Sequence, residues 1–432
     1  MENKPDQVPV FRARPVDERK TIVVRKEEKI LHPSIIPDNI LKDEFLNSLI
    51  SESLPKNYNF EIAKTIWKIV QNESKRVMLQ LPEGLIRFGT VLIDIFTGYF
   101  LQNGREDVKF ILMGDLTYGA CCIDDYLATS LGCDLIVHYA HSCLVPINKL
   151  MDSVKYLYIF LDIKFELTHV LNCIRHNFQP DVHKIALAST IQFVSSIHDL
   201  ARQLRDSGYT ITLPQSRPLS SGEVLGCTAP KLDPCVNTIV FICDGRFHLE
   251  ALMISNPEIK AYRYDPYSRK LTHETYAFDE MYKQRTSAIN RALEVMGKGG
   301  RFGLVLGTLG RQGNENLFDR LVQRLKSTTD CDIIKVLMPE VVQDRLELFD
   351  SVDVWVQVAC PRLSIDWGSF FHTPLLNPFE FAQCFKAFVK GEHALSVTRG
   401  KNYPMDFYAK NSSGDHTPNH SCQSNPNCEC SA

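Results

Sequence analysis

An alternation of continuous apolar strands and amphipathic helices, restarted three times, is the feature that most constrains how this chain can fold. The three passes begin near Val77, Lys184 and Phe302, roughly 110 residues apart, which is the size of one domain. Strands that are apolar without alternation are typical of parallel sheets covered by helices on both faces. The sequence therefore predicts an α/β protein of three similar domains, each a small parallel sheet flanked by helices.

The domain boundaries are predicted from these repeats and from the polar ends of the chain. Residues 1–30 carry mixed charge without an apolar pattern, which indicates a solvated arm. We expect an N-terminal arm and lead-in helix over 1–55, α/β domains over 56–180, 181–297 and 298–408, and a disordered cysteine-containing tail over 409–432.

Composition limits the kinds of partner and the cellular compartment. The net charge is −3, so no global basic field attracts nucleic acid or anionic lipid. No apolar run approaches the roughly 18 residues of a membrane span, and the polar start of the chain lacks a signal-peptide core. A cytoplasmic location is expected, where the 14 cysteines stay reduced and serve as core residues, metal ligands or catalytic thiols.

Three cysteines far apart in the chain occupy comparable places at strand ends. Cys121 follows the apolar run 108–113 through a short glycine-containing turn, Cys227 follows residues 219–226, and Cys360 ends the run 354–359. Ligand sites of open parallel sheets lie beyond the carboxyl ends of the strands. Our interpretation is that the three domains are arranged around a central site, where these cysteines hold one iron–sulfur cluster. Three thiolates would leave one iron open to an exogenous ligand.

Local spacing gives this hypothesis no help, because the chain contains neither a CxxxCxxC nor a CxxC ligand pair. Cys122 is the natural rival of Cys121, and Cys143 is the rival within the same unit. A packed thiol is the ordinary interpretation of both. Cys360 also follows the third strand of its unit, whereas the other two candidates follow the second. In the tail, Cys422, Cys428 and Cys430 could bind metal, although lone cysteines in a flexible segment are the simpler account.

Polar residues at other strand ends suggest where an anionic or carboxylate group could bind. His138, His141 and His248 are by default structural histidines, although His248 beside Arg246 could orient a carboxylate. The loop 307–313 offers glycine amides at a helix start, which suits an anion. It matches neither GxGxxG nor the Walker motif, so a nucleotide phosphate is only weakly indicated. A carboxylate held by Arg311, Gln312 and the glycine amides is an equal alternative, and a mere turn is favoured over both.

Several longer stretches make the sequence recognisable. The chain resembles the eukaryotic diphthamide synthase (2-(3-amino-3-carboxypropyl)histidine synthase) subunit 1 family over roughly residues 30–410. The resemblance is carried by residues 114–125, 138–146, 222–228, 244–250 and 358–368, and also by 264–267, 309–313 and 403–406.

The resemblance implies a non-conventional radical enzyme that uses S-adenosylmethionine (SAM). In such a family, three similar α/β domains each give one cysteine to a [4Fe–4S] cluster, and these cysteines fall here on Cys121, Cys227 and Cys360. Reductive cleavage of a C–S bond of SAM releases a 3-amino-3-carboxypropyl radical, which alkylates one histidine of translation elongation factor 2 in the first step of diphthamide biosynthesis. The candidates for holding SAM are Asp244, Arg246, His248, Arg311 and Gln312.

The implied partners are subunit 2 of the same synthase, which forms a heterodimer with subunit 1, and a small CSL zinc-finger protein that donates electrons. Two other functions are left open by the sequence. One is a [4Fe–4S] dehydratase or condensing enzyme similar to quinolinate synthase, which also joins three α/β domains around dispersed cysteines. The other is a non-catalytic scaffold that shapes a partner's site.

Overall fold

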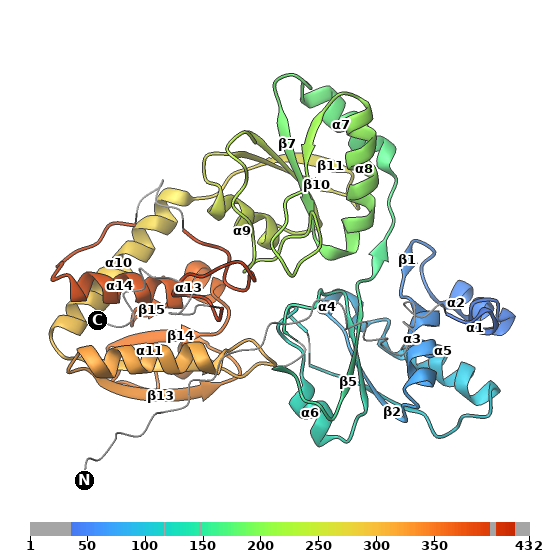
Figure 1. Cartoon of the computed structure of the whole chain (residues 1–432), viewed down its shortest axis with the longest axis horizontal. Coiled ribbons are helices and arrows are strands. Elements are labelled where there is room, and N and C mark those ends of the chain that lie inside the picture. Colours follow the sequence, from blue (N-terminus) through green and yellow to red (C-terminus); the bar gives the residue numbers. More distant parts are fainter. Residues whose placement is uncertain (1–35, 116, 147–148, 398–402, 420–432) are drawn as a thin grey trace, which may run out of the picture.

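Each repeat of the sequence forms its own sheet, and the three sheets occupy three separate parts of the molecule (Figure 1). The computed structural model describes residues 36–115, 117–146, 149–397 and 403–419. In every sheet the first strand of the repeat lies between the second and the third and runs parallel to both. The predicted fold class, α/β with three parallel sheets flanked by helices, is confirmed.

The first sheet has the order β3-β2-β4-β5 and is parallel throughout. Alternate side chains of β2 enter two different apolar clusters, with Val77 and Leu79 in one and Met78 in the other. This strand is therefore buried on both faces, as its continuous apolar run predicts. The unit contains α1 (Asp38–Leu41), α2 (Glu44–Ser53), β1 (Tyr58–Asn59), α3 (Ile62–Gln71), β2 (Arg76–Gln80), α4 (Glu83–Ile86), α5 (Gly89–Gln102), β3 (Lys109–Leu112), α6 (Asp125–Ser130), β4 (Leu135–Tyr139), β5 (Lys155–Ile159) and β6 (Asp162–Ile163).

The second sheet has the order β8-β7-β9-β10-β11, and its last strand is antiparallel to its neighbour. This hairpin was not predicted from the sequence. Asp265 accepts hydrogen bonds from the backbone N–H of Tyr267 at 2.9 Å and of Ser268 at 3.3 Å, which closes a tight turn and sends the chain straight back. The unit contains β7 (Lys184–Ser189), η2 (Ile191–Phe193), α8 (Val194–Asp206), β8 (Thr210–Thr212), β9 (Thr238–Ile242), α9 (Phe247–Ser255), β10 (Lys260–Asp265) and β11 (Lys270–Glu274).

The third sheet has the order β13-β12-β14-β15 and is again parallel. Its last helix begins with a capping box in which Asn377 and Glu380 satisfy each other's backbone N–H, and Pro378 occupies the first turn. The unit contains β12 (Arg301–Gly307), α11 (Glu315–Thr328), β13 (Asp332–Met338), α12 (Gln343–Leu346), β14 (Val354–Val358), α13 (Arg362–Trp367), β15 (Leu375–Leu376) and α14 (Pro378–Val389).

Two helices at the predicted domain boundaries pack against the unit that follows them. From α7 (Leu167–Asn177), the Nδ1 atom of His169 lies 3.0 Å from the Tyr264 hydroxyl of the second unit. From α10 (Phe278–Gly297), Arg285 makes a buried ion pair with Glu380 of the third unit. We therefore propose domain boundaries before α7 and before α10, rather than after them.

The chain end departs from the prediction of a disordered tail over 409–432. Residues 403–419 cross from the third unit to the second and back, and we call them the C-terminal strap. Ala409 and Thr417 are buried in it, and Arg320 of α11 donates a hydrogen bond to the Thr417 carbonyl at 2.8 Å. The prediction was wrong for residues 409–419, because partners from other units supply the burial that this polar stretch cannot supply by itself. The predicted solvated arm over 1–30 and the tail cysteines at 422, 428 and 430 lie outside the described residues. Among the residues described, no helix has both the length and the apolar character that crossing a bilayer requires.

Candidate metal centre

Cys121 lies on the loop between β3 and α6, at the carboxyl edge of the first sheet. Its backbone carbonyl accepts a hydrogen bond from the Arg311 N–H of the third unit at 2.8 Å. Gly310 of the same loop has a φ of +52°, and a Cβ at this position would lie 2.6 Å from the carbonyl carbon of Cys122. Only glycine allows this approach, so the loop after β12 fits directly against the cysteine-bearing loop of the first unit.

Cys227 lies on the long connection between β8 and β9. A narrow reverse turn holds it, in which Leu225 and Thr228 exchange backbone hydrogen bonds of 3.1 and 3.2 Å. The C-terminal strap lies alongside this turn, because the Phe407 N–H donates to the Cys227 carbonyl at 3.2 Å. A Cβ at Gly226 would lie 2.1 Å from the Phe247 ring, so this turn is packed against α9.

Cys360 follows β14 and precedes α13. The buried Gln357 holds this corner, since its side chain accepts from the Ala359 N–H at 2.8 Å and donates to the Cys360 carbonyl at 3.0 Å. The observed strand order confirms that the three cysteines do not occupy equivalent positions. Cys121 and Cys227 follow the outer strands β3 and β8, whereas Cys360 follows β14, which lies on the other side of its central strand.

The structure brings these three cysteines together. Cys121 belongs to a small apolar cluster at the meeting of the units, and Cys227 and Tyr408 pack against it. A hydrogen bond with Cys122 and burial raise the pKa of the Cys121 thiol, and the nearby thiols of Cys227 and Cys360 raise it further. Burial also raises the pKa of Cys227 to about 12 and that of Cys360 to about 11. The three buried thiols, one from each unit, therefore lie near enough to influence one another's protonation.

A single metal ion and an iron–sulfur cluster require different spacings between the sulfur atoms. Within the described ranges, no group of three or more His, Cys, Asp or Glu side chains could hold one metal ion. A single ion needs every sulfur at about 2.3 Å from one point. In an iron–sulfur cluster each thiolate binds a different iron, so the sulfurs stand further apart.

Of the other cysteines considered from the sequence, Cys122 and Cys143 were rivals of Cys121, and Cys133 and Cys384 are core residues. The Sγ of Cys122 lies 4.0 Å from that of Cys121, so this rival stays beside the centre. Cys143 donates to the Val145 carbonyl at 3.6 Å. Cys133 and Cys384 are packed in the apolar cores of the first and third units, as expected for thiols that act as small hydrophobes.

Among the predicted SAM-holding residues of the second unit, one has a free buried polar atom. Asp244 is exposed, and Arg246 is paired with Glu250 at 3.4 Å and Glu274 at 3.2 Å. Burial lowers the pKa of His248 to about 4, with His141 close enough to lower it further. The Nδ1 atoms of His141 and His248 are buried without a hydrogen-bond partner. These two neutral imidazoles are thus available to a ligand.

The predicted anion seat at residues 307–313 is occupied by the protein itself. Besides the Arg311 N–H, the Gln312 N–H is used by the Leu309 carbonyl and the Gly313 N–H by the Gly307 carbonyl. The Arg311 guanidinium binds both oxygens of the buried Asp125, at 2.9 and 2.7 Å. The Gln312 and Gly313 amides therefore close the loop on itself, and Arg311 joins the third unit to the first, while the binding of a carboxylate by Arg311 and Gln312 stays a prediction.

Sequence reasoning missed Arg362, which follows Cys360 by two residues. Its guanidinium is buried, pairs with Glu250 at 2.7 Å and Asp366 at 2.9 Å, and lies 4.4 Å from the centre of the Phe247 ring. Its charge lowers the pKa of Cys227 and of Cys360 against the larger effect of burial. The sequence did contain a clue to Arg362, because it lies in the stretch 358–368, one of those that carry the family resemblance.

A cavity of about 490 Å³ opens beside the centre. That size is in the range of small-molecule sites. Its lining includes Cys121, Tyr126, Lys149, Arg311, Tyr408 and Lys410. Of the three candidate ligands, only Cys121 borders this space.

Fold and site together define a class of protein in which three α/β units each deliver one strand-end cysteine to a shared centre. Comparison with known proteins then gives the family. The model “Putative diphthamide synthesis protein” matches residues 81–393. The chain is 48% identical over 391 residues to subunit 1 of 2-(3-amino-3-carboxypropyl)histidine synthase from Schizosaccharomyces pombe, covering 89% of this chain and 84% of that protein. To the Homo sapiens protein of the same name it is 45% identical over 385 residues, covering 89% and 83%.

The chain belongs to the diphthamide synthesis family, with the subunit 1 proteins of 2-(3-amino-3-carboxypropyl)histidine synthase. The resemblance inferred from the sequence is confirmed. The fold is similar to that of Dph2 from Pyrococcus horikoshii, solved with a 4Fe-4S cluster, at a TM-score of 0.62 and 24% identity, covering 81% of this chain and 97% of that one. The name subunit 1 marks these relatives as parts of a synthase with several subunits.

Proposed function

We propose that this chain transfers the 3-amino-3-carboxypropyl group of SAM to the target histidine of translation elongation factor 2, using a [4Fe–4S] cluster held by Cys121, Cys227 and Cys360. The observation that supports the proposal is the convergence of these thiols, one from each unit, where the three units meet. Soft thiolates are the usual ligands of such clusters. When bound, a cluster with one open iron supplies the low-potential electron that cleaves a sulfonium C–S bond.

The residues present fit this group. The three thiols are neutral in the cluster-free chain, because burial raises the pKa of Cys227 and Cys360, and binding of iron would release their protons. Three protein thiolates would leave one iron of the cluster without a protein ligand, and SAM could bind there. Cys122, whose Sγ lies 4.0 Å from that of Cys121, is the alternative ligand of the first unit.

SAM would bind between the centre and the polar residues around it. The unpartnered nitrogens of His141 and His248 can donate to a carboxylate or accept from an ammonium group, and the methionyl end of SAM carries both. The roles of Asp244, Arg246, Arg311 and Gln312 remain predictions, and the structure favours His248 within that set. The cavity beside Cys121 is the space from which a second substrate can approach.

The proposal includes three macromolecular partners. Subunit 2 of the synthase forms the heterodimer, a small CSL zinc-finger protein supplies the electron, and elongation factor 2 is the protein substrate. We propose that the reaction takes place in the cytoplasm, where the eleven free cysteines of the described residues stay reduced.

Anaerobic reconstitution with iron and sulfide tests the cluster assignment. Cys121→Ala, Cys227→Ala and Cys360→Ala should each lose the brown absorbance and the electron paramagnetic resonance signal of the reduced chain. Cys133→Ala and Cys384→Ala, which change thiols in the cores of single units, should keep both. Equal iron content in all five variants would overturn the ligand assignment.

The reaction is tested with the reconstituted heterodimer, reductant and SAM. Formation of methylthioadenosine together with modification of the elongation factor supports the transferase. A coloured chain that leaves SAM intact would favour a dehydratase similar to quinolinate synthase. A chain that stays colourless, while the partner subunit alone carries the cluster, would identify a scaffold.

A further inference from the structure

The C-terminal strap, residues 403–419, is tied to two units at once. At its start Tyr403 is buried and donates its hydroxyl to Glu380 at 2.7 Å. Its middle pairs with the Cys227 turn, where the Ala229 N–H donates to the Met405 carbonyl at 2.7 Å. Further on, Asp415 binds Lys386 of α14 at 3.0 Å. The strap therefore holds the cysteine-bearing turn of the second unit against the third unit.

Tyr408 is the residue of the strap that faces the centre. Its ring packs with the apolar cluster that contains Cys121 and Cys122. Burial raises the pKa of its phenol well above the ordinary value, and Cys121, Cys227, Cys360 and Cys122 are all near enough to raise it further. One side chain thus lies close to all three candidate ligands and to their rival.

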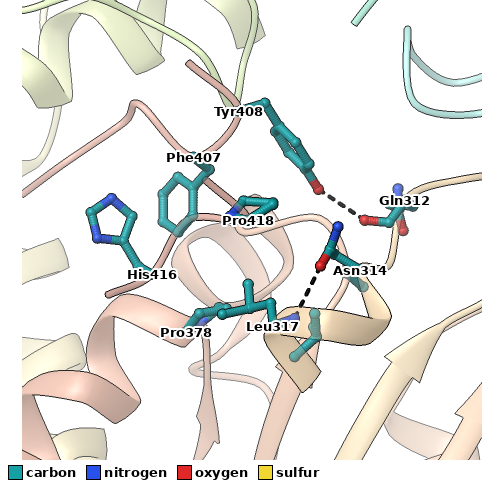
Figure 2. Close-up of a pocket in the computed structure, with 10 residues that line it drawn as sticks. Gln312, Asn314, Leu317, Pro378, Phe407, Tyr408, His416 and Pro418 are labelled. Atoms are coloured by element: carbon teal, nitrogen blue, oxygen red, sulfur yellow. Dashed lines mark hydrogen bonds between the residues drawn. The ribbon is translucent and has the colours of Figure 1, made fainter. Parts of the chain in front are cut away.

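Packing against the apolar cluster holds this ring, and one hydrogen bond ties its hydroxyl to the loop after β12. The Tyr408 hydroxyl donates to the Gln312 carbonyl at 2.9 Å, and Figure 2 shows it pointing at that oxygen, with Phe407 and Pro418 beside it. Gln312 belongs to the loop that fits against Cys121 and Cys122. The ring is thereby fixed between the strap and the first unit's cysteine loop.

Tyr408 also lines the cavity of about 490 Å³, together with Cys121. The Tyr408 ring therefore lies near the candidate ligand thiols and borders the cavity. We propose that Tyr408 is a positioning residue that forms the wall between the thiol centre and this cavity and limits what reaches the thiols from solvent. For the reaction, this inference rests on the proposed function, because a carbon radical formed near the centre must be kept from water and stray hydrogen donors.

The first test needs neither cluster nor SAM. In the cluster-free chain under anaerobic conditions, iodoacetamide labelling followed by mass spectrometry gives a rate for each cysteine. Tyr408→Ala should speed labelling of Cys121 about tenfold, the factor that a loss of about 1.4 kcal/mol of protection produces. Tyr408→Phe keeps the ring and should leave the rate near that of the unmodified chain. Lys410→Ala changes an exposed residue of the same strap and cavity and serves as the matched control.

Cys384 reports on folding in the same experiment, because it is fully buried in the core of the third unit. If Tyr408→Ala also exposes Cys384, Tyr408→Leu keeps more apolar volume and takes its place. An unchanged labelling rate of Cys121, in whichever variant leaves Cys384 protected, would overturn the inference.

The second test measures coupling in the reconstituted heterodimer. Each SAM cleaved yields one methylthioadenosine, and the carbon fragment is either joined to the protein histidine or lost by taking a hydrogen atom from another donor. Tyr408→Ala should lower the ratio of modified histidine to methylthioadenosine, and Tyr408→Phe should restore it. An unchanged ratio in Tyr408→Ala would refute the catalytic role of the wall. If the unmodified chain forms no cluster, the proposed function fails, while the labelling result still decides whether Tyr408 shields the thiols.

Discussion

The pair Arg311–Asp125 allows a sharp test of what the loop after β12 does. The sequence suggested that Arg311 holds SAM, whereas in the structure its guanidinium makes two hydrogen bonds to Asp125 and a third to the Tyr126 hydroxyl at 2.7 Å. Asp125 is completely buried and the Arg311 side chain is 17% exposed. Arg311→Met should therefore leave a buried carboxylate without its countercharge.

The magnitude follows from the partners that remain. Removing one member of a buried ion pair costs about 3–5 kcal/mol. Asp125 keeps the Met151 N–H at 2.8 Å and the Tyr156 hydroxyl at 3.4 Å, so we expect the lower end, about 3 kcal/mol. For a folding unit of the size of two domains this corresponds to a fall in Tm of about 6–12 °C. The double variant Arg311→Met/Asp125→Asn also removes the negative charge of Asp125, so it should recover part of the lost stability.

The assay combines thermal unfolding with SAM binding to the cluster-loaded chain. Arg202→Met is the control, since Arg202 makes an exposed pair with Asp199, and it should cost less than about 1 kcal/mol. If Arg311 joins the units, the affinity of the loaded chain for SAM should change by less than about threefold. An unchanged Tm with an affinity about tenfold weaker would refute the reasoning and support the sequence-based role.

Three further predictions concern the surroundings of the centre. Gly310→Ala should lower the iron content of the reconstituted chain and its stability, the latter by about 1–3 kcal/mol, because the added Cβ would meet the Cys122 backbone. Gly208→Ala is the control, since Gly208 also has a positive φ but has open space around it, so that this variant measures backbone strain alone. Equal losses of stability in the two variants would argue against the close approach at Gly310. His248→Asn should weaken binding of SAM more than binding of methylthioadenosine, because methylthioadenosine lacks the amino-acid end that His248 is proposed to contact. An equal loss of affinity for both ligands would refute that contact. The cluster-free chain should lose stability as pH rises above about 9, because thiols of the unfolded chain ionise there while burial raises the pKa of Cys227 in the folded chain to about 12. The urea midpoints of unfolding at pH 7 and pH 10 should therefore differ less in Cys227→Ala than in the unmodified chain. An identical pH dependence in both chains would contradict this account.

The sequence alone predicted the elements well where a local pattern was strong. The apolar run 354–359, which leads to Cys360, forms β14 (Val354–Val358), because a strand buried on both faces is apolar along most of its length. The hairpin β10–β11 was missed, since the direction of its last strand depends on a tight turn that leaves no periodic signal. The packing of α7 and α10 against the following units was missed for a related reason: an apolar helix face does not say which sheet will cover it.

For the site, the sequence identified the family, the strand-end cysteines and their unequal positions, because residue type and place along a strand are local properties. Only the tertiary structure decided that the three thiols come together where the units meet, that Arg311 joins two units, and that the chain end covers the centre with Tyr408. Those contacts join residues that are far apart in the chain, and the energy of burying a charge or a ring depends on what surrounds it rather than on its neighbours in sequence.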